Sequence, residues 1–325
     1  MDTVRYELKT LNRQFSLYAK TRVSLANNLI ALLDQSFPGV NRWFDSPARK
    51  DGSQKWVDRV EIQRISKSLR DRHGSNQRFE ARRLAATFWH AECVASISCA
   101  AFTERYRKWC KRHGYNFNTD KAAKIHAESR KIVSLVSKTE TTKLLVQEAA
   151  AQLLAVSRTV ETIRAEMLRL ASKLPEFDTV MSMYGVGEST GPQLMAEIGD
   201  IRRFAGKQLL VAFAGVDPMP NQSGSHESRS CRSSKRGSPY LRKTLFVIMT
   251  ILLQNAPAGE PVFQFLDRKR AEGKPYYVYM TAGANKFLRR YYGKVRDCFA
   301  AMDSPPPRLR TQWVRRSLRD RHGSN

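Results

Sequence analysis

The sequence has few cysteine residues, and their spacing excludes two common kinds of stabilising site. There are five in 325 residues, an odd number, and none belongs to a CxxC pair. This pattern argues against a disulfide framework and against a zinc site built from paired thiolates. The six histidines form neither an HExxH nor an HxxxH motif. We therefore expect no metal-binding residues in this chain.

Long apolar runs are also missing. The longest candidate, FVIMTILL at 246–253, follows Arg242 and Lys243 and precedes Gln254. It is too short to cross a bilayer and is typical of a buried helix. The N-terminal MDTVRYELK lacks the charged start and apolar centre of a secretory signal. We expect a cytoplasmic protein that has no membrane partner.

Acidic residues are scarce relative to basic ones. The chain has 56 Lys and Arg against 30 Asp and Glu, a net charge of +26. The positive electrostatic field of such a charge attracts a polyanion, and nucleic acid is the first candidate. The hydrophobic content of 42% is enough for a real core, so disorder throughout is excluded. Nucleic acid is therefore the expected partner, ahead of an anionic membrane surface.

Two segments carry apolar residues at alternating steps of three and four, the pattern of a coiled-coil seam. The first has the positions Val4, Leu8, Leu11, Phe15, Tyr18, Leu25, Leu29 and Leu32, and is interrupted by Arg22. The second has the positions Val146, Ala149, Leu153, Val156, Val160, Ile163, Met167, Leu170 and Leu174. The seams can pair as a hairpin in one chain or join two copies as a homo-oligomer, and the sequence leaves both open.

Between the seams, residues 41–130 mix aromatic and basic side chains, as in FTERYRKWCKRHGYNF at 102–117. Aromatic side chains interleaved with basic ones can stack on nucleobases, but a helical core with a cationic outer face also has this pattern. We favour the core interpretation.

A nonapeptide, SLRDRHGSN, occurs at 68–76 and again at 317–325. A separation this large does not fit a structural repeat, so duplicated or inserted DNA is the simpler cause. Residues 59–84 carry eight Lys or Arg against three acids, and the tail after Pro307 carries six Arg against one acid. We predict an insertion at 59–84 and a basic disordered tail at 301–325.

The second half begins with a glycine turn. Tyr184-Gly185-Val186-Gly187 has the form of the turn in a helix-hairpin-helix. Glycines allow close backbone approach, and the helix that opens near Ser189 would offer N–H groups to a phosphate. An ordinary turn between packed helices is the alternative. We favour the phosphate clamp, with Gly185 and Gly187 as nucleic-acid-binding residues.

A polar segment at 221–237, called the serine loop below, separates two apolar helices. The first helix ends at Gly215, and the second opens with Ser238 as N-cap and Pro239 at its first position. In and just after the loop, Glu227 is the one acid among six cations: Arg229, Arg232, Lys235, Arg236, Arg242 and Lys243. These cations are predicted to contact phosphate. A serine attacking a phosphodiester also needs a base, and His226 in a polar loop is a weak candidate.

Seven motifs in order resemble the transposase domain of the insertion-sequence one-ten family, whose members are guided by a bridge RNA. They are YGVG, AEIGD, FAGVDP, QSG, SKRG, PYLRKTLF and KPYYVYMTAGANKFLRRYY, and they cover roughly 178–300. The resemblance implies a serine that attacks DNA to form a phosphoserine, here Ser223 in Gln222-Ser223-Gly224. It implies that the neighbouring serines, such as Ser234, are phosphate or structural contacts. It also implies a guide RNA as a further partner.

Members of this family carry a RuvC-like domain with four acidic metal ligands before the coiled coil. Met1 already begins the coiled-coil segment, so we expect an N-terminally truncated copy. No cofactor is expected in this chain, and Mg²⁺ is expected only with the missing domain.

We therefore predict a mainly α protein with long coiled-coil helices, a helix-hairpin-helix, and a short β-hairpin or loop that carries the serine. The predicted units are a coiled-coil helix at 1–40, a helical region at 41–130, a coiled-coil helix at 131–176, the transposase domain at 177–300 and the tail at 301–325. The predicted function is serine attack on DNA in transposition, incomplete without the RuvC-like domain. The alternative is an inactive nucleic-acid-binding remnant that dimerises and competes with intact transposase.

Overall fold

The computed structural model describes residues 3–40, 83–84, 86–218, 222–223, 226–227 and 233–303, with the backbone alone for 222–223 and 226–227. The prediction of a mainly α protein is confirmed. The elements are α1 (Thr3–Ser36), α4 (Glu92–Ala95), α5 (Cys99–His113), α6 (Thr119–Ser129), α7 (Glu140–Ala171), α8 (Phe177–Met181), α9 (Thr190–Ile198), η2 (Ile201–Arg203), α10 (Lys207–Ala214), β1 (Gln222–Ser223), β2 (His226–Glu227), α11 (Pro239–Asn255), α12 (Pro261–Ala271) and α13 (Tyr276–Asp303).

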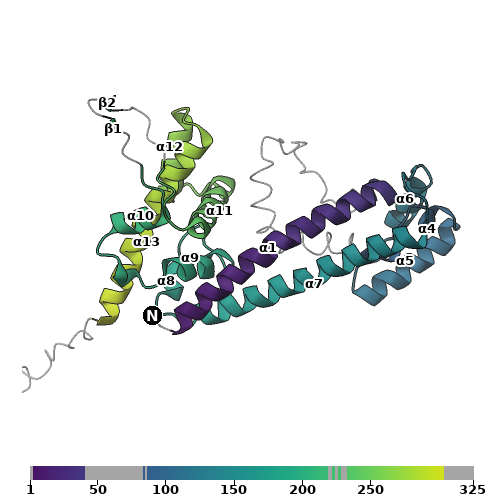
Figure 1. Ribbon diagram of the computed structural model, residues 1–325, viewed down its shortest axis with the longest axis horizontal. Helices are drawn as coiled ribbons and strands as arrows, with labels where there is room; N and C mark the ends of the chain where they lie inside the picture. The colour runs from purple at the N-terminus through teal and green to yellow at the C-terminus, as the bar shows by residue number, and fades with distance from the viewer. Residues whose placement is uncertain are drawn as a thin grey trace, which may run out of the picture.

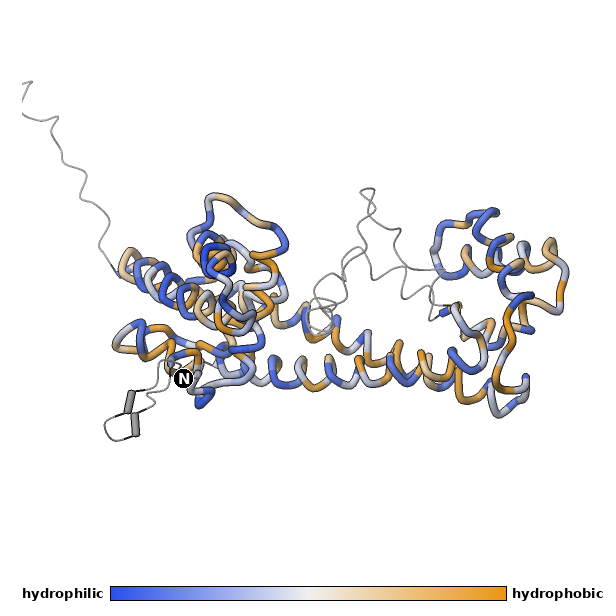
Figure 2. The backbone as a smooth tube through the Cα atoms, turned by 90° about the horizontal axis from the view of Figure 1, so that it is seen from above, coloured by the Kyte–Doolittle hydropathy of each residue, from blue (hydrophilic) through white to orange (hydrophobic). Residues whose placement is uncertain are grey.

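The molecule is elongated. Helices α1 and α7 run side by side from one end to the other (Figures 1 and 2). Helices α4, α5 and α6 lie at one end of this pair, and α8 to α13 lie at the other. The first group is called the distal unit below. At a rise of about 1.5 Å per residue, the 32 residues of α7 separate the two ends by roughly 48 Å.

The long helices pair because their seams face each other. Leu8, Phe15 and Leu29 of α1 are buried, as are Val146, Leu153, Val160 and Met167 of α7. Figure 2 shows hydrophilic and hydrophobic residues alternating along both helices. Of the two pairings that the sequence left open, the structure has the one within a single chain. Self-association through these helices stays a prediction.

Two hydrophobic cores lie at the two ends of the pair. One contains Leu8 and Met167 with residues of α8 to α13. The other contains Leu29 and Leu153 with residues of the distal unit. Both long helices contribute to both cores, so the pair connects the two ends physically.

The aromatic residues of the distal unit belong to the second core. Phe102, Tyr106 and Trp109 are buried, and their rings stack in succession along α5. The core interpretation of this stretch is confirmed for these residues, while Trp43 and Trp56 lie outside the described residues. Leu84, the last residue of the predicted insertion, is also fully buried in this core. Most of that insertion, the first copy of the nonapeptide and residues 304–325 lie outside the described part of the chain.

Candidate nucleic-acid site at the serine loop

The two ends of the serine loop are held together by paired backbone segments, residues 213–218 and 233–238, called the neck below. Ser238 N–H donates to the Phe213 carbonyl at 3.0 Å, and Lys235 N–H donates to Gly215 at 3.1 Å. Ser234 N–H donates to the Asp217 carbonyl at 2.9 Å, and its hydroxyl donates to the Asp217 carboxylate at 2.5 Å. Ser234 is thus a structural contact, one of the two roles predicted for it.

Two glycines allow the neck to close. Gly215 ends α10 in the left-handed conformation (φ 65°), as predicted for its position. A Cβ on Gly237 would lie 1.8 Å from the Phe213 carbonyl oxygen, and one on Gly215 would lie 2.8 Å from Gly237 N. The two backbones therefore approach more closely than any side chain permits.

The predicted phosphate-binding cations occupy different surroundings. Lys235 and Arg236 are exposed in the neck, and Lys243 is exposed on α11. Within the described residues no ion pair engages these three cations. Lys235 adopts a left-handed backbone conformation (φ 52°), which is uncommon for a residue with a side chain. Arg229 and Arg232 lie outside the described residues.

Arg242 has a structural role that the sequence did not predict. Its Nη1 donates to the Ala214 carbonyl at 3.1 Å and to the Gly237 carbonyl at 3.0 Å, so it crosses the neck. Burial lowers the pKa of its guanidinium. Its predicted contact with phosphate stays a prediction.

The start of α11 is tied to the long helix α1 through Glu197 of α9. The Ser238 hydroxyl caps α11 by accepting from Leu241 N–H, as predicted, and it donates to Glu197 Oε2 at 2.7 Å. Asn12 Nδ2 donates to Glu197 Oε1 at 2.7 Å, and Arg13 donates to Oε2 at 3.0 Å. Glu197 is only 2% exposed, so a carboxylate that would be costly to bury alone is satisfied by three donors.

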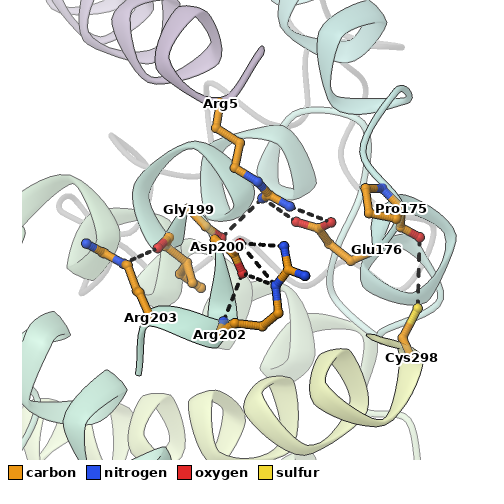
Figure 3. A network of polar contacts seen from close by, with 9 residues as sticks. Arg5, Pro175, Glu176, Gly199, Asp200, Arg202, Arg203 and Cys298 are labelled. Atoms are coloured by element: carbon orange, nitrogen blue, oxygen red, sulfur yellow. Dashed lines mark hydrogen bonds and ion pairs between the residues drawn. The ribbon is translucent and has the colours of Figure 1, made fainter. Parts of the chain in front are cut away.

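A second polar network contains the buried ion pair of Arg5 and Glu176 (Figure 3). Arg5 of α1 donates to both carboxylate oxygens of Glu176 and to the Gly199 carbonyl. Burial alone would lower the pKa of Arg5, but its bonds to Glu176 outweigh burial and raise the pKa. The neighbouring Asp200 accepts hydrogen bonds from Arg202, which lower the pKa of this carboxyl. Both networks clamp α1 onto the segment between α8 and α10.

The glycine turn lies between α8 and α9 and packs on α11. Gly185 has φ 81°, and a Cβ there would lie 3.0 Å from Ile248 Cγ2. Helix α9 opens after Ser189, as predicted. However, Gly187 N–H is already engaged, because it donates to Thr190 Oγ1 at 2.9 Å. This bond belongs to the turn and not to the start of α9, whose N–H groups were expected to hold the phosphate, so the phosphate clamp stays a prediction.

Ser223 lies in a two-residue strand. Strand β1 pairs antiparallel with β2, which places Ser223 opposite His226 and Gln222 opposite Glu227. The structure describes only the backbone here, so the roles of both side chains stay predictions.

The tyrosines of α13 differ in their burial. Tyr291 is fully buried, and burial strongly raises its pKa. Tyr277 is exposed, and the Tyr292 hydroxyl donates to the Phe204 carbonyl at 3.1 Å.

In the described part of the chain, no three or more His, Cys, Asp or Glu side chains gather in a way that could hold a metal ion. None of the described helices is both long and apolar enough to span a bilayer.

The site lies within a stretch that matches a known family. Residues 178–262 match the model of the transposase IS116/IS110/IS902 family. This stretch, called the transposase segment below, includes the glycine turn, Glu197, the neck and α11. The resemblance predicted between residue 262 and about residue 300 lies beyond this match.

Curated relatives include two insertion-element proteins. An uncharacterized 43.6 kDa protein of insertion element IS110 from Streptomyces coelicolor is 26% identical over 165 residues, 50% of this chain and 39% of that protein. An uncharacterized 42 kDa protein of IS900 from Mycobacterium paratuberculosis is 24% identical over 188 residues, 58% of this chain and 46% of that protein. A pilin gene-inverting protein of Moraxella bovis is 30% identical over 114 residues, 35% of this chain and 34% of that protein. The chain spans less than half the length of these relatives.

Sequence reasoning missed the residues that hold the transposase segment in place. Glu197 follows Leu194, Met195 and Ala196 in an otherwise apolar helix, and an isolated acid in such a run indicates a buried partner. Asp217 had no comparable signal, because acids before a proline are ordinary turn residues.

Proposed function

We propose that this chain is a DNA-binding transposase of an insertion sequence and that Ser223 attacks a DNA phosphodiester. The observation that supports it most is the neck, which fixes both ends of a cationic, serine-rich loop onto a buried helix inside the transposase segment. The relative named for pilin gene inversion supports DNA rearrangement as the class of reaction.

The proposed step exchanges one phosphodiester for another. Ser223 Oγ forms a bond to phosphorus, and the bond from phosphorus to one deoxyribose oxygen breaks. The serine hydroxyl loses a proton and the leaving oxygen gains one, so the step needs no net acid. Charge that develops on the phosphoryl oxygens is stabilised by cations already in place before the reaction.

Lys235, Arg236 and Lys243 are the described cations best placed for this role. They are exposed at the base of the loop, and ion pairs within the described residues do not compensate their charge. Arg229 and Arg232 are proposed to contact phosphate nearer the serine. Arg242 is proposed to act mainly by keeping the neck closed, because its Nη1 is used by two carbonyl groups.

The glycine turn, the long helices and a guide RNA are assigned further roles in this proposal. The α8 to α9 turn would contact the DNA backbone as a helix-hairpin-helix, and α1 and α7 would form a coiled coil that can also join two copies. A guide RNA would be a second nucleic-acid partner. Mg²⁺ chemistry would belong to a RuvC-like domain and to none of the described residues.

The test is whether the protein forms a covalent adduct with DNA. The full chain is incubated with nicked suicide DNA that carries the ends of its own element, with and without an added RuvC-like domain, and adducts are separated under denaturing conditions. Ser223→Ala should bind this DNA nearly as well as the wild type and form no adduct. The matched control, Ser225→Ala, should keep the adduct.

Two results would contradict the proposal. An adduct that persists in Ser223→Ala would exclude Ser223 as the nucleophile. A wild-type chain that binds DNA in a salt-dependent manner but forms no adduct under either condition would favour the alternative, a non-catalytic nucleic-acid-binding protein.

A further inference from the structure

A cationic cavity lies in the distal unit, at the opposite end of the long helices from the serine loop. Its volume is about 610 Å³, within the range of about 300–1,000 Å³ that is common for ligand pockets. Arg105, Lys108 and Arg112 of α5 line it together with Lys138, which precedes α7. Among the described residues that line it, none is Asp or Glu.

The charge of these cations is largely uncompensated. Lys108 has a distant carboxylate partner, Glu104, at 3.9 Å. Arg105, Arg112 and Lys138 form no ion pair within the described residues. The effect is visible on a neighbour, because burial together with Arg83 and Arg112 lowers the pKa of His113. Close like charges are unfavourable in a free protein, and an anionic ligand removes that cost.

The geometry of α5 suits a chain of phosphates. Positions 105, 108 and 112 follow a helical spacing of three and four, so these residues lie on one face. At about 1.5 Å per residue they span roughly 10 Å along the helix axis. Lys138 adds a cation from a second segment. A row of this length exceeds the separation of adjacent phosphates on one strand, so it can contact more than one of them.

The aromatic wall of the cavity limits the mode of binding. Trp109 lines the cavity but is only 4% exposed, and its indole N–H donates to Thr87 Oγ1 at 3.1 Å. Its ring stacks on Tyr106 and Tyr115 within the core. No open ring face is therefore available to stack a base, and recognition must come from the cations. Binding of this kind is independent of sequence and strongly dependent on salt.

We propose that this cavity binds the phosphate backbone of a single-stranded nucleic acid. A concave site admits a flexible strand more readily than a stiff duplex. The site is separate from the serine loop and does not depend on the proposed chemistry of Ser223. Because roughly 48 Å of α7 lies between the two ends, one nucleic acid that touched both would follow the long helices.

A thiol in the cavity reports its occupancy. Cys93 lines the cavity, and Cys99 is exposed near the start of α5 without lining it. The full Ser223→Ala chain is treated with N-ethylmaleimide in mildly alkaline buffer, because burial raises the pKa of the Cys93 thiol. Alkylation of each cysteine is followed by mass spectrometry. At a strand concentration near ten times Kd, alkylation of Cys93 should slow by about tenfold. The rate at Cys99 should not change.

Protection of Cys93 by different nucleic acids and phosphate compounds identifies the ligand of the cavity. Mixed-sequence single-stranded DNA and RNA should both protect Cys93, and duplex DNA should protect it less. Inorganic phosphate and ATP should protect it only weakly. Protection by ATP without protection by the strands would instead indicate a small phosphorylated compound. Full reactivity of Cys93 while a strand is bound to the chain would overturn the proposal.

A charge-matched pair of variants supplies the second measurement. Arg105→Ala, Lys108→Ala and Arg112→Ala together remove cavity cations, whereas Lys111→Ala, Lys124→Ala and Lys131→Ala remove exposed cations of the distal unit that do not line the cavity. For a single strand, each lost phosphate contact reduces the slope of log K against log salt concentration by roughly 0.7. The slope should therefore be smaller by about 2 for the first variant. Equal slopes in both variants would contradict the proposal. Cys110, fully buried, must stay unreactive in each variant as evidence that the core is intact.

Discussion

At the residue scale, a few contacts decide the shape of the candidate site. Gly237 and Gly215 bring two backbones together where no side chain fits. Glu197 accepts hydrogen bonds from Asn12 and Arg13 of α1 and from Ser238, the N-cap of α11. None of these residues would carry chemistry in the proposed step. Their role is to fix the position from which the loop cations and the serine act.

Gly237→Ala should open the neck. The added Cβ would lie 1.8 Å from the Phe213 carbonyl oxygen, so one of the paired segments must move. We expect the free energy of unfolding to fall by at least about 2 kcal/mol, the range for strain in a packed site. Urea unfolding measures the loss. Gly259→Ala is the control, because a Cβ there meets nothing within 4 Å. A Gly237→Ala chain as stable as this control would mean that the neck is not as closely packed as the contacts indicate.

At the element scale, α11 is positioned from both directions. Its N-terminus is capped by Ser238, and its apolar face carries Leu241, Leu245, Ile248 and Leu252 into the first core. The same hydroxyl that caps the helix also donates to Glu197. The helix cap and the contact with α9 therefore depend on one oxygen atom, and Glu197 in turn accepts hydrogen bonds from α1.

Replacing Ser238 removes both contributions at once, and a substitution at a second helix cap measures the cap alone. Ser238→Ala removes the cap and the bond to Glu197, so we expect a loss of about 2–3 kcal/mol in the free energy of unfolding. Thr139 caps α7 by accepting from Thr142 N–H and is exposed. Thr139→Ala should therefore lose only about 1 kcal/mol. Equal losses for the two variants in urea unfolding would show that the bond to Glu197 adds no net stability.

At the scale of the whole molecule, one pair of helices supports two distant cores and two candidate nucleic-acid surfaces. The neck belongs to one end, and the residues that line the cationic cavity belong to the other. Because α1 and α7 enter both cores, the distance between the surfaces is set by helix length and not by a linker. The arrangement is typical of a rigid spacer.

Variants in the two cores should disturb different ends. Leu8→Ala affects the first core and Leu29→Ala the second, and both side chains are at most 1% exposed. Each should lower the free energy of unfolding by about 2–5 kcal/mol. Leu29→Ala should speed alkylation of Cys93, and Leu8→Ala should speed that of Cys298, which contacts Pro175 at the other end. If both variants accelerated both cysteines equally, the ends would not behave as separate cores.

Local interactions made much of this protein predictable from its sequence. Ser238 and Pro239 start α11, and Gly215 ends α10, because caps and left-handed turns depend on residues within one helical turn. The periodic apolar residues of α1 and α7 indicated which faces are buried. The ordered motifs also indicated the family whose model matches residues 178–262.

Only the tertiary structure decided which distant groups meet. Asn12 and Glu197 are separated by 185 residues, and Ser238 and Glu197 by 41. The two seams could equally have joined two copies, because a seam specifies an apolar face but not its partner. Likewise, the basic residues of α5 line a cavity because Thr87, Cys93 and Lys138, from other segments, lie around the same space. Contacts between distant segments depend on how whole faces pack, and no short stretch of sequence contains that information.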